Sequence, residues 1–310
     1  MLESRCAVIL AAGAGRRLLP LTRDCPKCLV AVGGRPMLLR QLDLLEALGV
    51  GDVIVLTGYA ERAVRGACAG RARCVHNPDY ERTNSLYSLA LAEAAVGDRA
   101  LLLMNGDVVL EPALVARLLE APHEEALLVD LAACLDDEAM KVVVRDGCVA
   151  AIDKALHPAA ADGENVGVVK FGARGTRALF AAARALLAEG RADAWAPAAY
   201  ARMLAELPIG AVPTDGLPWA EIDFPADLER AEREVVPLID GPRPPAEPAA
   251  VRPGSPARPA ERPTPPAAGA AAQAPTPHRP AATARSGSAG PSERGGAGGE
   301  ARPLGRPDGP

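Results

Sequence analysis

The sequence predicts an α/β protein: a Rossmann-like, mostly parallel mixed sheet covered by helices on both faces, with an inserted β-hairpin and a disordered C-terminal tail. Short apolar runs typical of buried strands alternate with segments whose apolar residues recur at helical spacing. Such alternation favours a parallel sheet covered by helices. The composition then changes near residue 240, so we expect a folded domain over residues 1–240 and a tail over 241–310.

The first half of the domain contains the expected parallel strands. Apolar runs of strand length occupy residues 6–10, 53–57, 74–76 and 100–104. Residues 37–48 and 83–95 place leucines at helical spacing and are expected to form helices between these strands.

The second half contains a strong hairpin signal. Asp146-Gly147 separates two apolar runs, 141–145 and 148–152, and Asp-Gly favours a tight turn between antiparallel strands. We expect this hairpin to be an insertion that builds a lid or floor for a substrate. The other expected elements are strands at 127–131, 166–171, 211–214 and 219–222 and helices at 176–189, 198–207 and 225–235.

The tail differs from the rest in composition. Residues 241–310 contain 17 prolines and 11 glycines among 70 residues, and no aromatic residue. Such a segment cannot bury enough apolar surface to offset its ordering entropy, so we expect disorder. The tail has a net charge of +4 and the remainder −9, and an acidic body argues against a nucleic-acid-binding protein.

The cysteines and the hydropathy pattern favour a reduced, cytoplasmic protein. The seven cysteines are an odd number, no charged-then-apolar leader precedes them, and no apolar run approaches the roughly 20 residues of a membrane span. Cys25 and Cys28 form a C-x-x-C pair, but a structural zinc site needs about four ligands and no second such pair exists.

The loop after the first expected strand has the composition of a phosphate-binding loop. Gly13 and Gly15 allow a phosphate to approach the backbone, and Arg17 and Lys27 add positive charge. The sequence contains no Walker string, and Leu18 occupies the position where a dinucleotide fingerprint requires its third glycine.

This loop resembles the L-A-A-G-x-G-x-R-L-x-P-L-T…P-K-x-L signature of nucleotidyltransferases that act on sugar phosphates and small phospho-alcohols. The resemblance covers residues 5–238, although Arg16 stands where the family more often has Ser, Thr or Lys. It implies a nucleotidyltransferase fold and attack of a phosphate or phosphonate oxygen on the α-phosphorus of a nucleoside triphosphate, with release of pyrophosphate. Arg17 and Lys27 then become catalytic phosphate-binding residues, and the nucleotide-binding residues are Leu10, Ala11, Ala12, Gly13 and Gly15.

Three carboxylates are candidates for a Mg²⁺ site. Asp107 follows the expected strand at 100–104, and Glu221 and Asp223 share one face of a strand if period-two alternation holds. Carboxylates on one face repel unless a cation lies between them. The resemblance implies that Asp107 and Asp223 bind Mg²⁺, with Glu221 beside them.

Residues 77–89 resemble a segment of the cytidylyltransferases for phosphocholine and small phosphonates. Asn and Ser side chains suit a cytosine edge, which presents a donor and acceptors, so Asn84 and Ser88 are candidates for base or ribose contacts. Helix capping explains Asn84 as an alternative.

The acceptor site is expected near the hairpin. Lys141 and Lys154 are candidates to converge on the acceptor's phosphoryl group, and Gly167 either allows close approach of the acceptor or marks a strand bulge. The chain has nine aromatic residues, of which Tyr80, Tyr87 and Trp219 are near expected site segments. This scarcity argues against the aromatic cage that phosphocholine requires.

The sequence therefore predicts transfer of CMP from CTP to a small phosphonate such as 2-aminoethylphosphonate, 2-hydroxyethylphosphonate or phosphonoformate. The alternatives are a phosphocholine cytidylyltransferase, a sugar-1-phosphate nucleotidyltransferase and a non-catalytic nucleotide-binding protein. No nucleic-acid or membrane partner is expected, and the sequence leaves a homodimer open.

Overall fold

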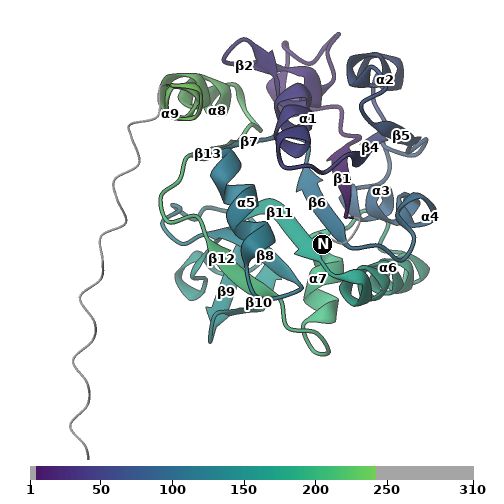
Figure 1. Ribbon diagram of the computed structural model, residues 1–310, viewed down its shortest axis with the longest axis vertical. Coiled ribbons are helices and arrows are strands. Elements are labelled where there is room, and N and C mark those ends of the chain that lie inside the picture. The colour runs from purple at the N-terminus through teal and green to yellow at the C-terminus, as the bar shows by residue number, and fades with distance from the viewer. Residues whose placement is uncertain (1–4, 242–310) are drawn as a thin grey trace, which may run out of the picture. The chain divides into compact units, whose positions relative to one another are not determined.

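The computed structural model describes residues 5–241, so all but the first residue of the expected tail lies outside the described residues. Within the described part, the main sheet has nine strands in the order β5-β4-β1-β6-β11-β8-β12-β10-β9 (Figure 1). Among residues 5–241, no helix is long and apolar enough to cross a membrane.

One half of the sheet is parallel, as the sequence predicts. β1 pairs in parallel with β4 on one side and β6 on the other, and β4 pairs in parallel with β5. The loops that follow β1, β4 and β6 therefore meet at one edge of the sheet, where open α/β sheets bind ligands. The bounds are β1 Cys6–Ala11, β4 Asp52–Thr57, β5 Arg73–His76 and β6 Leu101–Asn105.

The other half of the sheet is mixed. β11 is antiparallel to both β6 and β8, and β12 is parallel to β8. The expected hairpin forms as β9 and β10 but extends the edge of the main sheet, because β10 also pairs with β12 and β9 with β11. The hairpin is therefore continuous with the sheet, and its expected role as a lid or floor for a substrate stays a prediction. The bounds are β8 Ala126–Asp130, β9 Lys141–Arg145, β10 Cys148–Asp153, β11 Gly163–Phe171 and β12 Gly210–Pro213.

Helices cover both faces of the sheet, and the alternation along β1 shows why. Cys6 and Val8 contribute to one hydrophobic cluster, whereas Ala7 and Ile9 contribute to the cluster on the opposite face. The first cluster contains side chains of α3 Ser85–Leu91, α4 Glu93–Val96, α6 Ala173–Ala188 and α7 Pro197–Met203. The second contains side chains of α1 Met37–Ala47, α2 Glu61–Cys68 and α5 Pro112–Glu120.

A smaller cluster joins the C-terminal part of the domain to the loop after β1. Leu18 packs there with Val109, Ile222 and Val235. The cluster lies beside an antiparallel ribbon of β7 Val108–Leu110 and β13 Trp219–Glu221. The remaining elements are β2 Ala31–Val32, β3 Arg35–Pro36, α8 Pro225–Arg230, a π-helix Ala231–Val235, α9 Val236–Asp240 and 3₁₀ turns at Arg16–Leu18, Lys27–Leu29 and Pro158–Ala160.

Candidate active site

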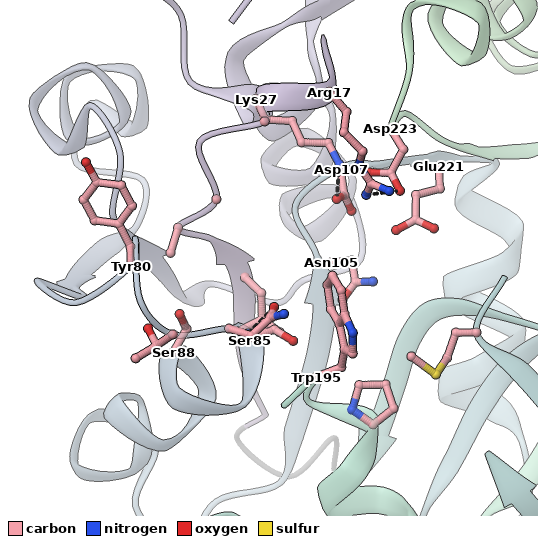
Figure 2. Close-up of a pocket in the computed structure, with 18 of the residues that line it drawn as sticks. Arg17, Lys27, Tyr80, Ser85, Ser88, Asn105, Asp107, Trp195, Glu221 and Asp223 are labelled. Atoms are coloured by element: carbon pink, nitrogen blue, oxygen red, sulfur yellow. Dashed lines mark hydrogen bonds and ion pairs between the residues drawn. The ribbon is translucent and has the colours of Figure 1, made fainter. Parts of the chain in front are cut away.

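A cavity of about 360 Å³ opens at the carboxyl ends of β1 and β6 (Figure 2). Its lining comes from the loop after β1, residues 77–88, the end of β6 and the residues that flank the β9–β10 hairpin, together with Asn165 of β11, the segment at the start of α7 and the end of β13. It includes most of the expected site residues, namely Leu10, Ala12, Gly13, Gly15, Arg17, Lys27, Asn84, Ser88, Asp107, Lys154, Glu221 and Asp223.

The geometry of the loop after β1 requires glycine at position 15. Gly15 has a φ of +62°, and a Cβ there would lie 2.8 Å from the Cβ of Lys27. The hydroxyl of Thr22 donates to the Gly15 carbonyl at 2.7 Å, which closes the loop onto itself. No heavy atom lies within 4 Å of a Cβ built on Gly13, so the backbone there is open to a ligand. Ala11, by contrast, is buried beneath the loop and does not line the cavity.

Lys27 bridges two of the expected metal ligands. Its Nζ donates to Asp107 Oδ2 at 2.6 Å and to Asp223 Oδ1 at 2.5 Å, and its side chain is 13% exposed. Burial lowers the pKa of Lys27, but the carboxylates of Asp107 and Asp223 outweigh burial and raise it above its ordinary value. Lys27 is therefore a permanent cation at the centre of the site.

Arg17 completes this charge cluster. It donates to Asp223 Oδ2 at 2.7 Å and to Glu138 Oε2 at 2.7 Å, and its guanidinium lies 4.9 Å from the centroid of the Phe224 ring. Burial raises the pKa of Asp223, but Lys27 and Arg17 outweigh it and hold that pKa below the usual range. Figure 2 shows both cations reaching the carboxylates from the loop after β1.

Asp107, Glu221 and Asp223 each offer an oxygen within 4.8 Å of the others. The β7–β13 ribbon brings them together, since Glu221 pairs with Val108 and the Ile222 N–H donates to the Asp107 carbonyl. β13 ends at Glu221, so Asp223 reaches the cluster from the turn after the strand, not from the expected strand face.

This donor set fits a hard divalent cation. Asp107 Oδ1 is buried and has no hydrogen-bond partner among residues 5–241. Burial, together with the charges of Asp107 and Asp223, raises the pKa of Glu221 to about 8. Three carboxylate oxygens, one of them unpartnered, are ligands that Mg²⁺ prefers.

Asn84 and Ser88 line the side of the cavity formed by residues 77–88. Asn84 caps α3, because its Oδ1 accepts from the Ser85 N–H at 2.8 Å, so the capping interpretation is confirmed. Ser88 is buried, and its hydroxyl oxygen accepts from Asn77 Nδ2 at 3.0 Å. Asn77 also donates to Thr83 Oγ1 and accepts from the Asp79 N–H, which fixes this segment in place.

The three expected acceptor residues lie in different places. Lys154 lines the cavity. Its Nζ lies 3.4 Å from Glu138 Oε2 and 4.7 Å from the centroid of the Trp195 ring. Lys141 does not reach the cavity: its side chain is fully buried and Nζ donates to the carbonyls of Ala139 and Lys154. It therefore holds together the two strands of the hairpin at its base instead of meeting a ligand.

Gly167 does not line the cavity either. It has a φ of +83° where the pairing of β11 with β8 shifts register, which is the bulge interpretation.

Trp195 also lines the cavity, although no motif in the sequence points to it. It lies between α6 and α7 and is 43% exposed. Of the expected aromatic residues, Tyr80 lines the same cavity, whereas the Tyr87 hydroxyl donates to Asp79. Cys25 and Cys28 belong to none of the metal-binding clusters found among residues 5–241.

A second cavity of about 440 Å³ adjoins the first and shares Glu138, Glu221 and Asp223 with it. Its lining is mainly acidic, with two aromatic rings and one arginine: Asp130, Asp136, Glu164, Asp227, Trp219, Phe224 and Arg230. Burial and the charges of Asp136 and Asp130 raise the pKa of Glu164 to about 7. The Glu164 carboxyl makes no hydrogen bond or ion pair with the described residues and faces this cavity, so it is available to a ligand.

Comparison with known proteins places these features in a family. The model of the MobA-like NTP transferase domain matches residues 7–203. The chain is 40% identical over 126 residues to the CMP-5'-(3-aminopropyl)phosphonate synthase of Streptomyces rubellomurinus, a match that covers 39% of this chain and 20% of that protein. It is 38% identical over 88 residues to the choline-phosphate cytidylyltransferase of Streptococcus pneumoniae, covering 28% of this chain and 38% of that protein.

These matches span well under two thirds of each curated relative. Among solved structures, the inositol-1-phosphate CTP transferase of T. maritima superposes with a TM-score of 0.66 and 22% identity, covering 78% of this chain and 98% of that one. At this identity the likeness shows the fold.

Proposed function

The chain belongs to the MobA-like NTP transferase family, and from this premise we propose that it transfers CMP from CTP to a small phosphonate, releasing pyrophosphate. The observation that carries the proposal is the contact of Lys27 with Asp107 and Asp223, which lie 80 and 196 residues away in sequence. The contact supports the proposal because it brings the loop after β1, with Arg17 and Lys27, to the three carboxylates at one cavity.

The reaction brings together two anions, so catalysis depends mainly on neutralising charge and aligning the reactants. Gly13 leaves backbone open to the triphosphate, Gly15 lets the loop pack closely against Lys27, and Arg17 and Lys27 supply the positive charge for the β- and γ-phosphates and for the transition state. Mg²⁺ held by Asp107, Asp223 and Glu221 would neutralise the charge between nucleotide and acceptor. The nucleophilic phosphonate oxygen is already ionised at neutral pH and needs no general base.

The choice of CTP rests on residues 77–88. Asn84 and Ser88 present amide and hydroxyl groups at the cavity surface, which suits the mixed donor and acceptor edge of cytosine. The names of both curated relatives describe cytidylyl transfer, which supports the same base.

The second cavity favours an acceptor that carries an ammonium group. The Glu164 carboxyl lies there without a hydrogen bond or ion pair to the described residues. Carboxylates outnumber the nearby cations, Lys154 and Arg230, and this excess of negative charge attracts a cation and repels the extra carboxylate of phosphonoformate. A primary ammonium can also donate hydrogen bonds to these carboxylates, whereas the quaternary ammonium of phosphocholine cannot. Of the candidate acceptors, 2-aminoethylphosphonate fits this chemistry best.

The test is a pyrophosphate-release assay with each of the four NTPs against 2-aminoethylphosphonate, 2-hydroxyethylphosphonate, phosphonoformate, phosphocholine and hexose 1-phosphates. CTP with 2-aminoethylphosphonate should give the highest kcat/KM. Faster turnover of UTP or dTTP with a hexose phosphate would show that the proposal is wrong.

The variant Glu164→Gln tests the ammonium site alone. It should lower the preference for 2-aminoethylphosphonate over 2-hydroxyethylphosphonate without changing the KM for CTP. An unchanged preference would remove Glu164 from acceptor recognition.

A further inference from the structure

The bulge at Gly167 organises two asparagine side chains on the cavity wall. The Gly167 N–H donates to Asn165 Oδ1 at 3.2 Å. A Cβ on Gly167 would lie 2.6 Å from Asn105 Nδ2, so only glycine leaves room for the Asn105 side chain at this point. Gly167 thus orients the Asn165 amide through its N–H and leaves room for the Asn105 side chain because it has no Cβ.

The contact with Gly167 determines which way the Asn165 amide faces. Because Oδ1 accepts from a backbone N–H, the donor group Nδ2 is the one left for the cavity. Asn165 is 6% exposed, and its Nδ2 donates to no acceptor among residues 5–241. Asn165 lines the cavity, so this amide donor, which has no acceptor in the described part of the chain, is free to donate to an oxygen of a bound ligand.

Asn105 repeats this pattern at the end of β6. Its side chain lines the same cavity and makes no hydrogen bond within the described part of the chain, although its backbone carbonyl accepts from Gln41. Figure 2 shows Asn105 beneath the carboxylates of Asp107 and Glu221, with Tyr80 and Ser88 on the other side of the view.

The position of the pair indicates which reactant it meets. Asn105 is two residues from Asp107, and the Asn165 N–H donates to the Met140 carbonyl at the base of the hairpin, near Lys154. In the proposed function, the nucleotide's phosphates bind to the loop after β1 and its base binds to residues 77–88. The two amides therefore border the space beside the reaction centre that is left for the acceptor.

We propose that Asn105 and Asn165 form the subsite for the acceptor's phosphonate oxygens, each donating from Nδ2, and that Gly167 is the residue that positions them. The inference rests on the proposed function and adds the group that holds the nucleophile. Neutral amide donors orient the phosphonate without a full positive charge on its oxygens, so the attacking oxygen keeps its nucleophilicity. The ligand class is a tetrahedral phosphonate or phosphate monoester dianion.

Asn165→Asp is the sharpest test, because an aspartate oxygen can still accept from the Gly167 N–H while the donor is replaced by a negative charge. We expect the KM for 2-aminoethylphosphonate to rise at least tenfold and the KM for CTP to stay within twofold. Asn105→Ala removes a side chain that forms no protein hydrogen bond in the described residues, and it should raise the acceptor KM about tenfold.

Asn84→Asp is the matched control, because it makes the same chemical change on the nucleotide side and keeps the helix cap. It should raise the KM for CTP and leave the acceptor KM within twofold. If Asn165→Asp and Asn105→Ala instead raise the KM for CTP, or leave the acceptor KM unchanged, the subsite is wrong.

Calorimetry with 2-aminoethylphosphonate separates this inference from the proposed function. Wild-type protein should bind the phosphonate at least tenfold more tightly than Asn165→Asp, whichever nucleotide it uses. Equal binding, or no binding by the wild type, overturns the subsite. Loss of binding in the variant, combined with turnover of another NTP, would keep the subsite and reject CTP.

Discussion

Replacing Lys27 by methionine tests the charge arrangement at the centre of the site. Methionine fills much of the same volume but removes the ammonium that bridges Asp107 and Asp223. Two carboxylates that are mostly buried then face Glu221 without their main counter-ion, while Arg17 still contacts Asp223. The variant should therefore be less stable at neutral pH and inactive as a transferase.

The structure sets the size of the effect. Breaking a buried ion pair by removing one partner costs about 3–5 kcal/mol. The carboxylates of Asp107 and Asp223 are partly exposed, so water screens their charges, and we expect the lower end, about 3 kcal/mol. For a domain of this size, 1 kcal/mol shifts Tm by about 2–4 °C, which predicts a fall of roughly 6–12 °C.

A divalent cation should reverse much of this loss. In wild-type protein without nucleotide, a metal ion would compete with Lys27 for the oxygens of Asp107 and Asp223. In Lys27→Met that competition is gone. Thermal unfolding with and without Mn²⁺ or Mg²⁺, in the absence of nucleotide, should show a larger rise in Tm for the variant than for wild type.

Lys170→Met is the matched control. Lys170 is also buried, but its Nζ donates to the backbone carbonyls of Leu119 and Ala121, and it does not line either cavity. Its removal should lower Tm without any added response to metal. Equal metal responses in Lys27→Met and wild type would refute the idea that Lys27 occupies the place of the cation.

Three further results are expected. Asp107→Asn should lower kcat at least a thousandfold in the pyrophosphate assay while circular dichroism shows an intact fold; activity within tenfold of wild type would rule out a metal ligand there. In EDTA, the free energy of unfolding should fall as pH rises from about 5 to 8, because folded Glu221, with a pKa of about 8, holds a proton that the unfolded chain releases near 4.5. Urea titrations of Glu221→Gln should show a smaller slope, with the remainder due to Glu164, whose pKa is also raised, to about 7; an unchanged slope would contradict the assignment. Deletion from Gly241 onward should leave kcat/KM within twofold, and a larger loss would assign the tail a role in turnover.

Sequence reasoning succeeded where the signal is local. The apolar run that becomes β1 and the glycines after it lie close together in sequence, so the strand and the glycine-rich loop that follows it could be located directly. The helix α5 was not predicted, although it has a local signal of the same kind. Pro112 stands at its first turn, and Leu114 and Leu118 follow at helical spacing.

It failed where the answer depends on pairing between distant strands. Nothing local shows that the hairpin joins the main sheet, because that depends on contacts of β10 with β12 and of β9 with β11. The direction in which Lys141 points follows from that pairing, and so does its burial beneath the hairpin. Trp195 lies in a connection between helices with no motif around it, and only the packing of α6 and α7 brings it to the cavity.

The charges at the reaction centre suggest how substrate and metal binding are coupled. Lys27 and Arg17 are paired with Asp107 and Asp223, and Glu221 is largely protonated at neutral pH, so the cluster is nearly neutral before any ligand arrives. A triphosphate that draws the two cations toward itself leaves the carboxylates to a divalent cation. Linkage then requires the reverse effect, in which the metal ion strengthens nucleotide binding by the same factor. The ion pairs of the free protein therefore favour joint entry of nucleotide and metal over entry of either one alone.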